Sequence, residues 1–285
     1  MVSLKMDPQS VNINGGPSDS LSGYFSPDGN FILELRKPLP LNLYAAGLVR
    51  DGLINARVDN IVLDLKTLSD FIAIPEFAIT AGSGTGNLRI TGPISNPDFY
   101  GTLYGANAYS ATRFIPERIG PYNAVFVVEG KTMQTKNAFL RTESGKAEAD
   151  VILTIDNWVP RGYDVRIRTV DSKGIPVQYL SSGINAHGYA VGALAIYEIN
   201  NGTWLGGDFV VHSCIINLGD RDETPPKGNV KNNELIVELN LTTGKRVEFL
   251  WPTPNFPILR AYADTEQVIS IKYEDLSGNL SVEGN

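Results

Sequence analysis

The side chains best suited to chemistry in this sequence are one cysteine, Cys214, and two histidines, His187 and His212. Cys214 follows His212 by two positions in an apolar run, so a regular strand would point both the same way, as a thiol and its activating base require. Neighbours at this spacing lie about 7 Å apart, and no orienting partner can be named. We therefore interpret both histidines as packed or surface residues. Three such residues are also too few for a zinc cluster or a disulfide framework.

A glycine-rich run, residues 82–87 (GSGTGN), has the composition of a phosphate-binding loop, in which glycines let backbone N–H groups approach an anion. The next residues, 88–92 (LRITG), read as a strand where that motif demands a helix. We therefore interpret the run as a hairpin turn. Residues 130–132 (GKT) match the end of a P-loop, but Val125 stands where its first glycine is required.

Hydrolysis of a glycosidic bond would need two carboxylates brought together from distant strands, and the sequence does not indicate which Asp or Glu residues could form such a pair. Trp158, Trp204 and Trp251 could stack on sugars. Each lies beside a turn signal, however, where aromatic corner packing is the commoner role. The residues therefore predict that the chain is not an enzyme and holds no metal or cofactor, and a carbohydrate-active β-protein stays open as an alternative.

Composition narrows the class of protein further. The 285 residues carry 31 Asp and Glu against 24 Lys and Arg, a formal net charge of −7. Because nucleic-acid binding needs clustered Lys and Arg, nucleic acid is not an expected partner. Apolar residues make up 42% and charged residues 19%, so the chain can bury a core.

Alternating hydrophobicity predicts the elements that position these side chains. Apolar and polar residues alternate through Ala147–Ile155, Asp164–Val170 and Glu234–Leu241, the pattern of strands with one buried and one wetter face. Turn signals rich in Asn, Asp and Gly follow at short intervals, which fits strands of about 6 to 12 residues. The sequence therefore predicts a nearly all-β fold.

Two segments depart from this pattern. In Ile61–Ile74, Leu65, Leu68 and Ile72 recur at helical spacing, so a short helix or an irregular edge-crossing fits the sequence about as well as a strand. Residues 219–233 are charged and contain consecutive prolines, which a central strand excludes. They are the candidate for a flap or subdomain boundary in what otherwise reads as one continuous repetitive sheet over residues 1–285.

A loose repeat supports this organisation. Residues 84–103 and 188–211 share a rhythm of strand, break and glycine-opened strand, which indicates stacked units instead of a closed core. Residues 1–20 lack the basic start and apolar run of a signal peptide, and no run reaches the ~20 apolar residues of a membrane-spanning helix. We expect the chain to be a piece of something longer.

The apolar face of the predicted strands is the remaining candidate site. If that face stays uncovered it forms a trough that acyl chains fill favourably, whereas a closed sandwich or β-solenoid would show the same alternation. Periodicity does not separate the two. The candidate lining residues are Ala149, Val151, Leu153, Ile155, Val165, Ile167, Leu235, Val237, Leu239 and Leu241.

Several motifs, in order, resemble the TamB and AsmA-like proteins of bacteria with outer membranes. Residues 90–103 (ITGPISNPDFYGTL) are similar to the recurrent family phrase ϕxGxϕxxPxϕxGxϕ, where ϕ is an apolar residue. A DLxxL segment, residues 64–68, precedes them. Residues 124–167 and the run from Gly206 to Leu218 are also similar to family strands. The resemblance covers roughly residues 50–285.

This resemblance implies a long, twisted, U-shaped open sheet of stacked short strands, called a β-taco, with at most one or two short helices. It further implies a periplasmic location, with an inner-membrane anchor outside this chain. Members of the family are linked to phospholipid transport between the two membranes and to outer-membrane protein assembly. The implied partners are phospholipid acyl chains and, through regions outside this chain, an outer-membrane BamA-like barrel. A structural β-solenoid or adhesin-like interaction protein is the alternative.

Overall fold

The computed structural model describes residues 2–7, 10–16, 19–37, 39, 41–71, 77–181, 184–199, 202–219, 235–274 and 279–284. Within these ranges the chain is nearly all β, with a single short helix. In chain order the elements are β1 (Val2–Asp7), β2 (Ser10–Gly15), β3 (Leu21–Phe25), β4 (Asn30–Leu35), β5 (Leu41–Arg50), β6 (Leu53–Asp64), α1 (Leu65–Phe71), β7 (Phe77–Pro93), β8 (Asp98–Thr112), β9 (Ile115–Gly130), β10 (Thr132–Arg141), β11 (Lys146–Asp156), β12 (Val159–Thr169), β13 (Ile175–Ser181), β14 (Ile184–Ile199), β15 (Gly202–Leu218), β16 (Leu235–Thr243), β17 (Val247–Trp251), β18 (Leu259–Tyr262), β19 (Val268–Glu274) and β20 (Asn279–Gly284).

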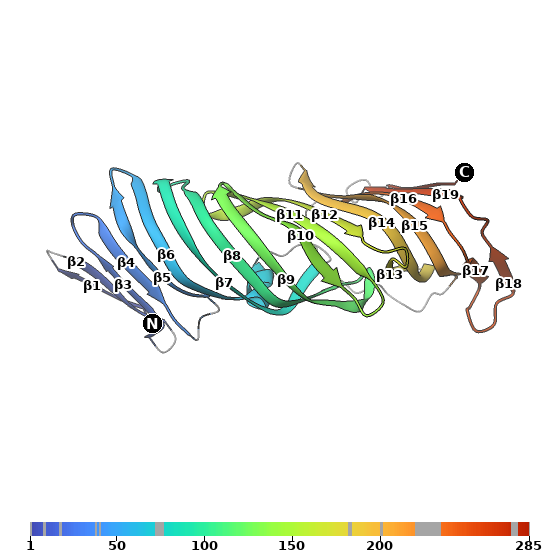
Figure 1. Cartoon of the computed structure of the whole chain (residues 1–285), viewed down its shortest axis with the longest axis horizontal. Coiled ribbons are helices and arrows are strands. Elements are labelled where there is room, and N and C mark those ends of the chain that lie inside the picture. The colour runs from blue at the N-terminus through green and yellow to red at the C-terminus, as the bar shows by residue number, and fades with distance from the viewer. Residues whose placement is uncertain are drawn as a thin grey trace.

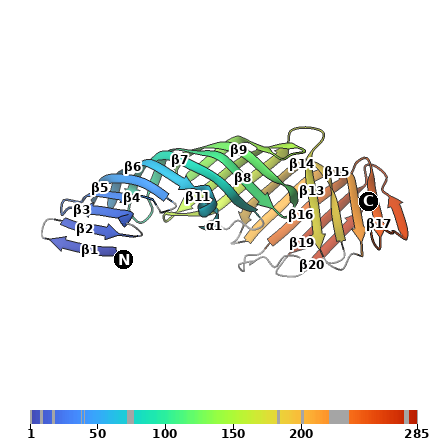
Figure 2. The ribbon, with the colours of Figure 1, turned by 90° about the horizontal axis from the view of Figure 1, so that it is seen from below.

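All the strands belong to one open, twisted sheet. From β1 to β12 each strand pairs antiparallel with the next, so chain order is also spatial order along the long axis of the molecule (Figure 1). The expected all-β open sheet is therefore confirmed. Seen from below, the middle strands arch over the long axis (Figure 2).

Beyond β12, each of the long strands β14 and β15 pairs along one edge with two shorter strands that lie end to end. One half of β14 pairs with β12 and the other half with β13, both antiparallel. The long strand β15 then pairs with β14 on one side and, in parallel, with β16 and β17 placed end to end on the other. The remaining antiparallel pairs are β16 with β19, β17 with β18 and β19 with β20.

The three alternating segments lie where the pattern predicted strands. Ala147–Ile155 falls inside β11, and Asp164–Val170 overlaps β12, which ends one residue earlier. β16 begins at Leu235, and Glu234 lies outside the described residues. Of the charged candidate flap at 219–233, only Gly219 is described.

The predicted strand length of about 6 to 12 residues holds for strands such as β5 and β11, but β7–β9, β14 and β15 are longer, and the predicted hairpin turn at residues 82–87 is wrong. β7 runs through the glycine-rich run without turning, and it has 17 residues, as does β15. The glycines serve close packing inside the strand instead. A Cβ at Gly86 would lie 2.4 Å from the Thr102 carbonyl oxygen of β8, and Gly82, with φ at 131°, sits where the β7–β8 register shifts. A glycine at such a position bends the strand and does not end it.

The ambiguous segment Ile61–Ile74 contains both of its predicted structures. β6 continues to Asp64, whose carboxylate oxygen accepts hydrogen bonds from the N–H groups of Lys66 and Thr67 at 3.0 and 3.3 Å and so caps the start of α1. Leu65 packs where glycines of β7 and β8 leave room, since a Cβ at Gly84 would meet its side chain at 3.3 Å. Figure 2 shows α1 beneath the arch. Residues 72–76 lie outside the described residues.

The family-like phrase forms the β7–β8 hairpin. Its apolar positions Ile90 and Phe99 are cross-strand partners and are both buried. Gly101 is opposite Leu88, and a Cβ there would lie 2.2 Å from the Asn87 carbonyl oxygen. The second proline of the phrase, Pro97, is fully buried in the turn. The phrase therefore encodes a tightly packed hairpin in this chain.

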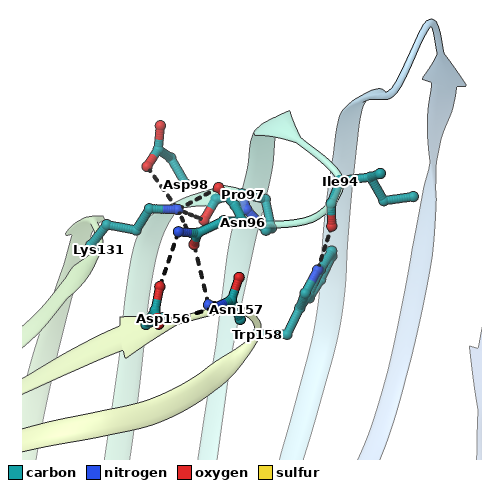
Figure 3. Close-up of polar contacts among 8 residues, drawn as sticks. All are labelled: Ile94, Asn96, Pro97, Asp98, Lys131, Asp156, Asn157 and Trp158. Atoms are coloured by element: carbon teal, nitrogen blue, oxygen red, sulfur yellow. Dashed lines mark hydrogen bonds and ion pairs between the residues drawn. The ribbon is translucent and has the colours of Figure 1, made fainter.

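Side chains join three successive turns along one rim of the sheet (Figure 3). Lys131, between β9 and β10, donates to the carbonyl and side-chain oxygens of Asn96 at 2.6 and 2.7 Å and to the carbonyl of Pro97. Asn96 in turn donates to Asp156 at 3.0 Å, at the end of β11. The Trp158 indole N–H, in the β11–β12 turn, donates to the Ile94 carbonyl at 2.6 Å. Hairpins far apart in sequence are thereby held at a fixed spacing.

Gly101→Ala is expected to reduce the free energy of unfolding by about 2–4 kcal/mol, because its Cβ collides with the β7 backbone in addition to straining a positive φ. Gly52→Ala is the control, since Gly52 has φ at 75° but open space around the Cβ position. Its expected cost is about 1 kcal/mol. Urea unfolding measures both, and equal costs would contradict the close approach.

Lys131→Met is expected to cost about 1–2 kcal/mol, since it leaves the oxygens of Asn96 and Pro97 without their charged donor. Lys136→Met, at an exposed position in β10, is the control and should change stability by less than about 0.5 kcal/mol. Urea unfolding of the two variants checks this. A Lys131 variant as stable as the control would show that the rim contacts do not stabilise the sheet.

Candidate functional site

Cys214 and His212 lie on either side of an irregular point in β15. Ser213 between them has φ at 48°, so the strand alternation breaks at this point. The Cys214 thiol is buried, and desolvation raises its pKa, which disfavours the reactive thiolate. The His212 ring stacks on Tyr189 with centroids 5.8 Å apart, and its Nε2 has no hydrogen-bond partner among the described residues. His187 is exposed on β14, opposite Ile215 of β15.

The tryptophans occupy three separate places in the sheet. Trp158, in the β11–β12 turn, packs edge-on against Phe99, the corner packing that the turn signal indicated. Trp204, inside β15, stacks on Tyr197 of β14 with centroids 4.6 Å apart. Trp251 ends β17 and is 46% exposed. The part of the chain that the structure describes contains no group of three or more His, Cys, Asp or Glu that could hold a metal ion.

The apolar side chains do come together, because residues directly opposite one another on neighbouring strands share a face. From β2 to β11 the pairing aligns one unbroken row of apolar residues and glycines. The row is Ile13, Gly23, Leu33, Ala45, Val58, Leu88, Gly101, Val128, Met133 and Leu153.

Two further rows on the same face continue from β11 to β16 and beyond. One is Val151, Val165, Ile196, Leu205 and Val237. The other is Ala149, Ile167, Leu194, Gly207, Leu239 and Ile271.

The remaining residues proposed from sequence fit this arrangement where the structure describes them. Ile155 packs against the buried cluster, and Leu241 is opposite Phe209 of β15. Leu235 pairs with Thr203 at the start of β16, and its side chain lies outside the described residues. The register therefore places the described members of the sequence-derived set on one continuous face, which we call the apolar face.

Burial divides the apolar face into two parts. Within β4–β9 a cluster of side chains that are at most 9% exposed, with Phe31, Val58 and Phe99 among its members, is flanked by half-buried leucines such as Leu33 and Leu88. In the two rows that run from β11 to β16 the larger side chains, such as Val151 and Leu239, are half-buried, and this part has no comparable cluster among the described residues. The first part is therefore a closed core, and the second leaves apolar surface in reach of a ligand.

The opposite face from β11 onward is polar and charged. Arg168 of β12 pairs with Glu148 of β11 at 2.6 Å, and Arg166 pairs with Asp164 at 3.0 Å. A shallow hollow of about 540 Å³ lies on this side, with Trp204 and Glu238 among its lining residues. Its carboxylates are already engaged in part, since Glu148 binds Arg168 and Glu238 accepts the Trp204 indole N–H at 3.2 Å. Most of its lining residues alternate with the apolar rows, and Ile167, Leu194 and Gly207 of those rows also contribute to it.

Comparison with known proteins adds no relative. The chain matches no protein-family model, no curated protein and no solved structure. Among the described residues, no helix is long and apolar enough to span a membrane. The resemblance drawn from the motifs therefore stands on the residues alone.

The Cys214 thiol is expected to react with a thiol-specific disulfide reagent at pH 8 at least 100-fold more slowly in the folded protein than in urea, because it is buried and its pKa is raised. Absorbance of the released chromophore measures the rate. Replacing His212 with alanine should leave the thiol slow. Fast native labelling that depends on His212 would instead identify an activated thiolate.

Proposed function

We propose that this chain is a lipid-conducting segment whose apolar face carries phospholipid acyl chains from β11 onward. The observation that carries the proposal is the half-buried, unbroken apolar face described above. Each methylene of an acyl chain removed from water contributes about 0.8 kcal/mol, so a chain lying on such a face is held by its length. Because the face is apolar along its whole length, no single position holds an acyl chain more tightly than the next, and the lipid can slide along it.

The shape of the sheet supports this role. Strands follow one another at about 4.8 Å, which makes the sheet about 75 Å long. Charged pairs such as Glu148 with Arg168 occupy the other face, so apolar and polar surfaces are segregated. A lipid could keep its acyl chains on one face with its headgroup in water.

The proposed family and cellular role rest on the resemblance of the sequence motifs. We infer that the chain is a segment of a TamB or AsmA-like envelope protein that moves phospholipid between inner and outer membranes in the periplasm and supports outer-membrane protein assembly. An inner-membrane anchor and contact with a BamA-like barrel would lie in other regions of such a protein. Support comes from residues 90–103, the segment that resembles the family. In this segment Gly101 allows the close approach of the β7 backbone, and Pro97 is buried in the turn.

A structural role is the second candidate, and the burial of β4–β9 favours it for that part of the sheet. There the apolar face is a closed core, with Val58 and Val128 at most 6% exposed. A conduit through this part would require the core to separate. The conducting role is therefore assigned to the half-buried part alone.

The test is mass spectrometry of lipid that copurifies with the folded protein, expected to be phospholipid. Val151→Asp places a carboxylate on the apolar face and is expected to remove at least 90% of this lipid, because an ion in contact with acyl chains loses its hydration. Val237→Asp, four strands away on the same row, repeats the test at an independent site.

Val210→Asp is the matched control, since Val210 is 43% exposed and alternates with apolar-face residues in β15. It should retain lipid. Folded wild-type protein free of lipid would overturn the proposal. If both apolar-face variants unfold while the control folds, the face is a closed core and the structural alternative holds.

A further inference from the structure

The hairpin that joins β17 to β18 presents the most exposed large apolar side chains in the described part of the chain. Phe256 is 85% exposed and Ile258 79%, and Leu259, at 56%, is paired with Trp251 across the base of the loop. These four residues are called the apolar tip. Figure 1 shows β17 and β18 at one end of the long axis, opposite the end that holds β1 and β2.

Hydrogen bonds within the loop help to fix the conformation of the tip, and Trp251 at its base lies beside Gly219. The Ile258 N–H donates to the Trp251 carbonyl at 2.7 Å, and the Phe256 N–H donates to the Thr253 hydroxyl at 3.3 Å. Prolines at 252, 254 and 257 restrict the backbone further. In this loop conformation Phe256 and Ile258 project into solvent.

Charge is absent from the whole tip. Residues 251–259 (WPTPNFPIL) contain no Asp, Glu, Lys or Arg. The first charged residue after them, Arg260, is held by Glu248 of β17 at 2.6 Å. Tyr262, 67% exposed, follows at the base. The tip therefore has apolar side chains at its apex and Trp and Tyr at its base. Membrane-inserted segments show the same order, with apolar groups among the acyl chains and Trp and Tyr at the headgroups.

We propose that the apolar tip inserts into the surface of a lipid bilayer. Even if every exposed side chain of the tip and Tyr262 were covered, the area would be on the order of 600 Å², below the ~800 Å² that a standard protein interface takes from each partner. A convex tip also gives a protein partner few points of contact. Fluid acyl chains close around such a shape without needing a complementary surface.

The inference goes beyond the proposed function and does not depend on it, since the tip and the apolar face share no residue. It identifies where this chain would touch a membrane. If both hold, the tip sets the end of the sheet against the bilayer from which lipid enters or into which it leaves.

Flotation of the chain with phosphatidylcholine vesicles on a density gradient tests the proposal. Wild-type protein is expected to rise with the vesicles. The double variant Phe256→Asp/Ile258→Asp should lose about tenfold or more of the bound fraction, because each substitution replaces an inserted apolar group with an ion. The variant should fold normally, since both side chains are almost fully exposed.

Val125→Asp is the control, with a 50% exposed side chain on β9 that is remote from the tip in the sheet order, and it should float like wild type. Binding should be unchanged by salt, because the tip carries no charge. Failure of wild type to float, or flotation only with anionic vesicles at low salt, would overturn the proposal. A dimer in solution that the double variant dissociates, without flotation, would identify a second copy as the occupant. Val151→Asp should still float, which separates this test from the test of lipid conduction.

Discussion

Cross-strand register is the constraint on which the rest of this structure depends. Because side chains alternate along every strand, a shift of one residue between any two neighbours would move a strand's apolar set to the charged face. The pairing of Val151 with Val165, and of Val165 with Ile196, keeps that set on one side. An open sheet has no closed barrel to enforce this agreement, so each pair of strands must be fixed locally.

Turns and glycines supply that local fixation. Lys131 ties its own turn to the β7–β8 turn, and Asn96 carries the connection on to Asp156. Inside the strands, glycines such as Gly86 and Gly101 let neighbouring backbones approach more closely than a Cβ allows. Rim contacts thus set the spacing of the hairpins, while glycines set the curvature between them. The two together hold the apolar face continuous through the bends of the sheet.

The two surfaces with proposed roles differ in how they arise. The apolar face is a product of many strands, and its chemistry was readable from alternation in segments such as Ala147–Ile155. The apolar tip is a product of one loop, and its run of apolar residues around Phe256 could equally have been core. Only its exposure shows that this run is a surface loop and not a core segment, and exposure depends on whether another part of the chain covers it. The buried cluster around Phe99 could not be predicted for the same reason, because the spacing of apolar residues in the sequence does not show which strands pack together.

The sequence by itself determined the all-β class and the faces of the strands, because alternation is a local property. It misplaced the turn at Gly82–Gly84, since a glycine that bends a strand and one that ends it look alike in sequence. Only the tertiary structure decided that Ser213 breaks the side-chain alternation within β15 and that β15 pairs in parallel with β16. It also decided where the apolar face forms a buried cluster and where it stays half-buried. Those outcomes depend on pairing between distant segments, which local patterns do not encode.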